Sequence, residues 1–236
     1  MDEHINNNYN RAQLIYREGI ENSAHSLQYF DDLLNCNISE FIIKAGKDWK
    51  NFDVDTAMDF FISNNNIEAF YHAGIYWKNF NYERGINAII EWGNDEYIFR
   101  AGRFWKQFDY DKGLSKLVQL QSAKYIYHAG LDWKQFDFTK GFNALMLIGD
   151  PEYIFYAGTH WTVFNHSVAT DKLIFIGDCE YIYKAGYQWE WFDYYNGWKI
   201  LESKIVEGRS WRGKALQTDV WKNALKKIWE KAIANK

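Results

Sequence analysis

Residues 98–117 read IFRAGRFWKQFDYDKGLSKL, and this pattern of small and aromatic residues occurs six times along the chain at an interval of 28 residues. In every copy, tryptophan follows three residues after the glycine of an Ala-Gly pair, and phenylalanine follows three residues after the tryptophan. The six pairs are Ala45-Gly46, Ala73-Gly74, Ala101-Gly102, Ala129-Gly130, Ala157-Gly158 and Ala185-Gly186. Because a fixed period without insertions is typical of stacked structural units, the sequence predicts a repeat protein.

The spacing of apolar residues inside one copy is helical. In the fourth copy they fall at i, i+3, i+4, i+7 and i+10, which is one face of an α-helix; these residues are Ile126, Ala129, Gly130, Trp133 and Phe136. We therefore expect each copy to begin with a helix of about 11 or 12 residues whose buried face includes the tryptophan and the phenylalanine.

A second helix is expected after the phenylalanine of each copy. Asp or Asn follows that phenylalanine, as Asp109 follows Phe108, and both are good N-cap residues. Gly149 suits the left-handed position that ends a helix, and Asp150-Pro151 suits the start of the next one. Equivalent glycines end the second helix in two other copies, at Gly93 and Gly177.

These signals predict an all-α fold, an α-solenoid of six helix–turn–helix repeats over residues 40–207. Residues 11–39 resemble a degenerate copy and are expected to form an N-terminal cap, preceded by a flexible segment over residues 1–10. Residues 208–236 are expected to form a basic amphipathic capping helix. Its apolar stripe consists of Leu216, Val220, Trp221, Leu225, Ile228, Trp229 and Ile233. Such a helix is also suited to a membrane surface or an acidic partner.

Composition and charge restrict the function classes. The formal charge is −4, and residues 208–236 hold eight Lys or Arg against two acidic residues, so that segment carries +6 and residues 1–207 carry −10. An acidic body gives no overall attraction to nucleic acid. The only cysteines, Cys36 and Cys179, lack metal-ligand spacing, and no apolar run is long enough to span a bilayer. With no signal-peptide pattern, we expect a cytoplasmic protein with free thiols.

The pattern of the third copy resembles that of the tetratricopeptide repeat, although the unit here is shorter and lacks that family's proline. The matching residues are Ile98, Ala101-Gly102, Trp105, Gly113 and Leu117. The resemblance covers residues 40–207. It implies a concave surface, lined by the first helix of each repeat, that binds peptides or protein partners.

Residues that vary between copies on the exposed side of the first helix are the candidate binding residues. One row is basic in five copies: Lys44, His72, Arg100, His128, Tyr156 and Lys184. It forms a cationic stripe suited to an acidic peptide or a phosphate backbone. The alternative is local ion pairing, because glutamates precede several of these residues by four positions; they are Glu40, Glu68, Glu96 and Glu180.

A second row begins with four carboxamides and ends with two apolar residues: Asn51, Asn79, Gln107, Gln135, Val163 and Trp191. Carboxamides both donate and accept hydrogen bonds, so this row is suited to clamping the backbone of an extended peptide. The alternative is that these side chains are solvated or stabilise the turn between the two helices.

Two neighbouring rows combine aromatic and charged residues. They are Lys47, Ile75, Arg103, Leu131, Thr159 and Tyr187, and beside them Asp48, Tyr76, Phe104, Asp132, His160 and Gln188. Exposed aromatic residues and arginine are typical interface anchors. We therefore expect Tyr76, Phe104 and Tyr187 to be anchors, unless a neighbouring helix covers them.

The sequence contains no catalytic constellation, no metal-ligand spacing and no cofactor motif, so we expect neither an enzyme nor a bound metal or cofactor. The leading hypothesis is a protein- or peptide-binding scaffold, for example an immunity protein, an antitoxin or an effector-type interaction protein. One alternative is a nucleic-acid-binding or base-processing repeat protein that uses the basic row. Another is a homo-oligomer assembled through the aromatic flanks; the sequence leaves the oligomeric state open.

Overall fold

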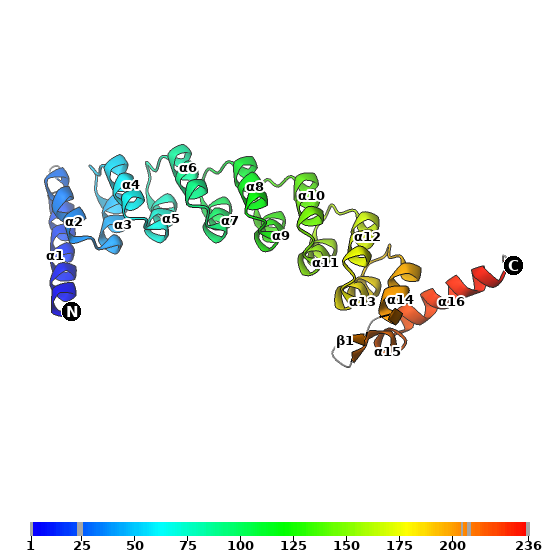
Figure 1. Ribbon diagram of the computed structural model, residues 1–236. Coiled ribbons are helices and arrows are strands. Elements are labelled where there is room, and N and C mark those ends of the chain that lie inside the picture. The colour runs from blue at the N-terminus through cyan, green and yellow to red at the C-terminus, as the bar shows by residue number, and fades with distance from the viewer. Residues whose placement is uncertain (1, 23–25, 204, 207–208, 235–236) are drawn as a thin grey trace. The chain divides into compact units, whose positions relative to one another are not determined.

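The computed structural model describes residues 2–22, 26–203, 205–206 and 209–234, and it is an all-α solenoid in which helices pack in sequence order (Figure 1). The chain divides into two compact units, residues 1–116 and residues 117–236. Each unit is a stack of helical hairpins. Within a unit, the first helices of successive hairpins lie side by side in one layer, and the second helices form the other layer (Figure 1).

The first unit begins with α1 (Asp2–Glu21), the 3-10 helix η1 (Ser26–Tyr29) and α2 (Phe30–Cys36). Its hairpins are α3 (Ser39–Asp48) with α4 (Val54–Ser63), α5 (Ile67–Tyr76) with α6 (Tyr82–Trp92), and α7 (Asp95–Phe104) with α8 (Tyr110–Gln119). The boundary between the units falls inside α8.

The second unit contains α9 (Ala123–Asp132) with α10 (Phe138–Ile148), α11 (Pro151–His160) with α12 (His166–Ile176), and α13 (Cys179–Gln188) with α14 (Tyr194–Ser203). These hairpins are followed by β1 (Ile205–Val206), β2 (Arg209–Ser210), α15 (Trp211–Ala215) and α16 (Asp219–Ala234). The two strands pair antiparallel, with Ile205 opposite Ser210.

Helix starts and ends follow the local signals. The Asp53 carboxylate accepts a hydrogen bond from the Thr56 backbone N–H at 3.0 Å, as an N-cap should. Gly149 ends α10 at φ 75°, in the left-handed region, and Asp150 caps α11 with Pro151 at its first position. The predicted caps and stops are confirmed.

The first helix of each hairpin ends immediately before the tryptophan. In α5 the last residue is Tyr76, and Trp77 is extended at φ −77° and ψ 133° while its N–H bonds to Ala73 O at 2.9 Å. Trp133 is extended in the same way after α9. The prediction that the tryptophan and Phe136 continue the helix was therefore wrong. Where the chain leaves the helix, the indoles of Trp77, Trp105 and Trp161 pack against the preceding hairpin.

Within each unit, a repeat glycine is the contact point for the indole of the following hairpin, as at Gly46, Gly74, Gly130 and Gly158. A Cβ added to Gly74 would lie 2.4 Å from the Trp105 ring, so any side chain there would displace the indole. The Trp105 Nε1–H donates to Tyr71 O at 3.0 Å, which joins the two hairpins by a buried hydrogen bond. In the second unit, Trp161 contacts Gly130 and donates to the equivalent backbone carbonyl. Glycine in mid-helix thus admits the neighbouring hairpin.

At the N-terminus, α1 packs as the first helix of an additional, degenerate hairpin. Gly19 is covered by Trp49, whose Nε1 donates to Tyr16 O at 3.2 Å. The helix begins at Asp2, so it includes most of the segment for which we expected no regular structure. The Tyr9 ring contacts Phe41 with its centroid 5.1 Å away, and this packing supports the helix before residue 11.

The C-terminal segment is not a single amphipathic helix. It forms α15 and α16 with a break at residues 216–218 between them, and the expected boundary at 207–208 lies outside the described residues. Trp221 and Leu225 of the predicted stripe are buried, whereas Val220 and Trp229 are exposed; the side chain of Ile233 lies outside the described part of the chain. Helix α16 therefore packs on α13 and α14 through part of the stripe only.

Candidate binding surfaces

The basic row does not form a continuous cationic stripe. Lys44, Arg100 and Lys184 each pair with the glutamate four residues earlier, at N–O distances of 2.5, 2.8 and 2.6 Å. Exposed pairs of this kind contribute only a few tenths of a kcal/mol, but they neutralise the cations locally. These three residues therefore form local ion pairs, which was the alternative to a cationic stripe.

The other members of the basic row lie among aromatic rings. His72 stacks on Tyr76 with ring centroids 6.0 Å apart and an interplanar angle of 11°. In the second unit, Tyr156 and His160 both pack against Tyr127, and the His160 Nδ1 is 2.9 Å from the Tyr127 hydroxyl. Burial is the largest cause that raises the pKa of Tyr127. The structure thus brings Tyr156 and His160 into one aromatic cluster, in which His128 also contacts Tyr127.

The carboxamide row lies in the connections between helices and not on the first helix, because that helix ends earlier than expected. Asn51, Asn79, Gln107 and Gln135 are all exposed. The corresponding positions in the later hairpins, Val163 and Trp191, expose 60% and 71% of their surface.

The three expected anchors are exposed. Tyr76, Phe104 and Tyr187 show 48%, 52% and 53% of their surface, so no neighbouring helix covers them. The Arg103 guanidinium lies 5.0 Å from the centre of the Phe104 ring, which is a cation–π distance. Asp132, in the same row as Tyr76 and Phe104, is only half exposed.

A cavity of about 380 Å³ lies beside Tyr76. Its lining consists of Glu40, Ile43, Lys44, Lys47, His72 and Tyr76, from α3 and α5. The His72 Nδ1 is buried there and has no hydrogen-bond partner among the described residues. A buried ring nitrogen without a partner is unfavourable, so a ligand that forms a hydrogen bond with it would remove that cost.

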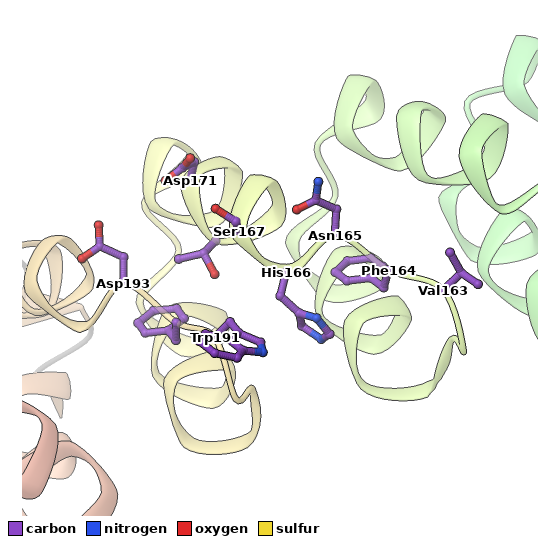
Figure 2. Close-up of a pocket in the computed structure, with 10 residues that line it drawn as sticks. Val163, Phe164, Asn165, His166, Ser167, Asp171, Trp191 and Asp193 are labelled. Carbon is purple, nitrogen blue, oxygen red and sulfur yellow. The ribbon is translucent and has the colours of Figure 1, made fainter.

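A larger cavity, of about 790 Å³, lies in the second unit between the start of α12 and the connection that precedes α14 (Figure 2). Trp191 and Val163 lie along it; above Trp191 in this view are Asp171, on α12, and Asp193, in the connection immediately before α14. The His166 Nε2–H donates to Gly158 O at 2.8 Å, which fixes that ring against the first helix. We name this cavity the Trp191 groove.

Sequence reasoning missed the Trp191 groove. The signal was present, because Val163 and Trp191 interrupt a row that is otherwise carboxamide. The change from carboxamide to apolar residues in adjacent copies is the feature that indicates a different surface there.

Within the described part of the chain, no group of three or more His, Cys, Asp or Glu side chains is placed to hold a metal ion. No helix built from those residues combines the length and apolar character needed to cross a bilayer. Both cysteines, Cys36 and Cys179, are buried.

The helical-hairpin geometry places the chain among helical-repeat folds. Comparison with protein-family models, with curated proteins and with solved structures found no match, so these findings add no family to the fold.

Proposed function

We propose that this protein is a binding scaffold whose protein or peptide partner contacts the exposed face of the first helices. The observation that carries the proposal is the repetition of exposed aromatic side chains at one surface position in adjacent hairpins. Tyr76 and Phe104 end α5 and α7 in this way, 28 residues apart. Large aromatics that remain exposed at matched positions are typical of interface anchors.

The surroundings of these two rings support the same proposal. His72 stacks on Tyr76 and Arg103 lies against Phe104, so both rings are partly held in place before any partner arrives. A pre-ordered side chain loses less conformational entropy on binding. The acidic local partners of Lys44 and Arg100 make this face less suited to nucleic acid, which requires unpaired cations.

The experiment compares the wild type with the Tyr76→Ala, Phe104→Ala double variant as bait, with quantitative mass spectrometry of what each retains. We expect recovery of a specific partner to fall by at least about tenfold, because anchor truncations cost that much or more. Circular dichroism establishes that both baits are equally folded.

The matched control is the Leu147→Ala, Phe175→Ala double variant. These two side chains are also apolar, exposed and one repeat apart, but they lie on the second helices α10 and α12. Its recovery should equal that of the wild type. A loss in the control with none in the first variant would place the partner on the second helices and overturn the proposal.

A further inference from the structure

The Trp191 groove has an equivalent in the first unit, three repeat periods earlier. That smaller groove, of about 260 Å³, is lined by Tyr82, Glu83, Ile86, Gln107, Phe108, Asp109 and Lys112. In the second unit the same positions hold His166, Ser167, Thr170, Trp191, Phe192, Asp193 and Asn196. The two grooves therefore share a backbone framework and differ in their side chains, which makes the first an internal reference for the second.

The first difference is charge. In the first-unit groove, the Lys112 ammonium lies 3.9 Å from the Asp109 carboxylate and 3.5 Å from the Asn87 side-chain oxygen. In the Trp191 groove, Asn196 replaces that lysine and Asp171 replaces Asn87. Ser167 also replaces Glu83, so the first-unit groove has two carboxylates and a lysine, whereas the residues that line the Trp191 groove include two carboxylates and no lysine or arginine. The Asp193 carboxylate also caps α14, because its two oxygens accept from the Asn196 backbone N–H at 3.1 Å and from the Asn196 side-chain amide at 2.7 Å.

The second difference is an exposed indole. Trp191 replaces Gln107, and Val163 replaces Asn79. Trp191 exposes 71% of its surface, and Figure 2 shows it below the two aspartates. An indole face attracts a cation through its ring quadrupole, and the negative charges of the same groove add to that attraction.

The third difference is a buried hydroxyl. Thr170 replaces Ile86, is only 1% exposed and lines the groove. Its Oγ1 has no hydrogen-bond partner among the described residues. A buried polar atom without a partner is unfavourable, and a ligand that donates a hydrogen bond removes that cost.

We propose that the Trp191 groove binds an arginine side chain of a partner protein. The guanidinium stacks on the Trp191 indole, and the carboxylates of Asp171 and Asp193 in the same groove attract its charge. Arginine fits better than lysine because its planar group stacks on aromatic faces and carries five donors in a fixed fork. The groove lies at helix connections of the second unit, whereas Tyr76 and Phe104 belong to the first helices of the first unit, so this inference goes beyond the scaffold proposal.

The test uses the full chain and three blocked tripeptides as probes, with arginine, citrulline or lysine between two glycines. The indole N–H resonance of Trp191 is identified by its loss in Trp191→Gln and is followed by nuclear magnetic resonance. The arginine probe should shift this resonance saturably. Citrulline has nearly the same shape without the charge and should bind at least about tenfold more weakly, with lysine between the two.

Variants that copy the first-unit groove sharpen the test. Asp171→Asn restores the residue found at position 87 and should weaken the arginine probe by about tenfold, because half of the groove's charge is removed. Asp171 is exposed and makes no described ion pair, so this change leaves the fold intact. Tyr187→Ala, on the first-helix surface of the same unit, is the control and should bind as the wild type does.

An unshifted Trp191 resonance at saturating arginine probe would overturn the inference, as would equal binding of citrulline or unchanged binding by Asp171→Asn. These outcomes are independent of the scaffold proposal, whose partner recovery depends on Tyr76 and Phe104. If the arginine probe fails to shift the Trp191 resonance while partner recovery still depends on Tyr76 and Phe104, the arginine site is contradicted and the scaffold proposal stands.

Discussion

The indole of Trp221 covers Gly186, although Trp221 lies outside the 28-residue period. A Cβ added to Gly186 would lie 2.3 Å from this ring, and the Trp221 Nε1 donates to Tyr183 O at 3.3 Å. Inside the repeats the tryptophan comes 31 residues after the glycine, as Trp77 follows Gly46, whereas here the interval is 35 residues. Helix α16 therefore places a tryptophan over Gly186, where the tryptophan of a further repeat would otherwise lie.

Removal of this tryptophan should destabilise the second unit. We expect Trp221→Ala to lower the free energy of unfolding by about 3–5 kcal/mol, because a fully buried indole and its hydrogen bond are lost. Urea unfolding followed by circular dichroism measures the change. Trp229→Ala on the same helix is the control, since that ring is 54% exposed and its loss should cost about 0.5 kcal/mol or less. Equal losses would contradict the capping role of Trp221.

Gly74→Ala should lower the free energy of unfolding when Trp105 is present and raise it when Trp105 has been replaced by alanine. In the wild type the new methyl group would lie 2.4 Å from the Trp105 ring, and such overpacking costs about 1–3 kcal/mol. In a Trp105→Ala background the ring is absent, so the better helix propensity of alanine should stabilise the chain by up to about 1 kcal/mol. A double-mutant cycle from urea unfolding checks this, and additive effects would show that glycine is not required by the indole.

Two tryptophans at equivalent positions should respond differently to phenylalanine. Trp161 Nε1 donates to Tyr127 O at 3.1 Å, whereas Trp189 Nε1 is buried without a partner among the described residues. The carbonyl equivalent to that of Tyr127 belongs to Phe155 and already accepts the Thr159 hydroxyl at 2.9 Å.

We therefore expect Trp161→Phe to cost about 1 kcal/mol more than Trp189→Phe, which is the net value of one hydrogen bond. Thermal and urea unfolding of the two variants give the comparison. A larger loss at position 189 would show that its N–H does contribute.

The contact between Tyr16 and Asp48 predicts a loss of stability in alkali. Burial, together with the hydrogen bond from the Tyr16 hydroxyl to the Asp48 carboxylate at 2.6 Å, raises the pKa of Tyr16 to about 12. Because the folded state holds the phenol proton more tightly than the unfolded state does, the protonated Tyr16 contributes its full stabilisation below the unfolded pKa of 10.0. This contribution is lost as the pH rises from 10.0 through about 12. Urea unfolding of wild type and Tyr16→Phe at pH 8 to 12 should show a wild-type advantage that disappears at high pH. A pH-independent difference would count against the contact.

Local features of the chain were predictable because local interactions produce them. The cap at Asp53 and the left-handed turn at Gly149 each depend on a few adjacent residues. The exposure of Tyr76, Phe104 and Tyr187 was also predictable, since it follows from where each residue lies on a short helix. Their binding role stays a prediction.

Features that depend on a neighbouring hairpin were harder to predict. Nothing in the spacing of Trp133 and Phe136 shows that the helix has already ended, because the apolar period continues through the extended connection. The Trp191 groove needed the pairing of two connections that lie one repeat apart in sequence. Its unusual composition was visible, but the cavity was not.

The sequence by itself determined the period, the all-α class and the hairpin boundaries, because repeated caps, glycines and apolar spacing act within a few residues of one another. Only the tertiary structure decided which indole covers which glycine, how α16 closes the second unit, and where a groove remains open. Those outcomes depend on how side chains from different hairpins pack together. Packing between segments about 30 residues apart in sequence leaves no local signal.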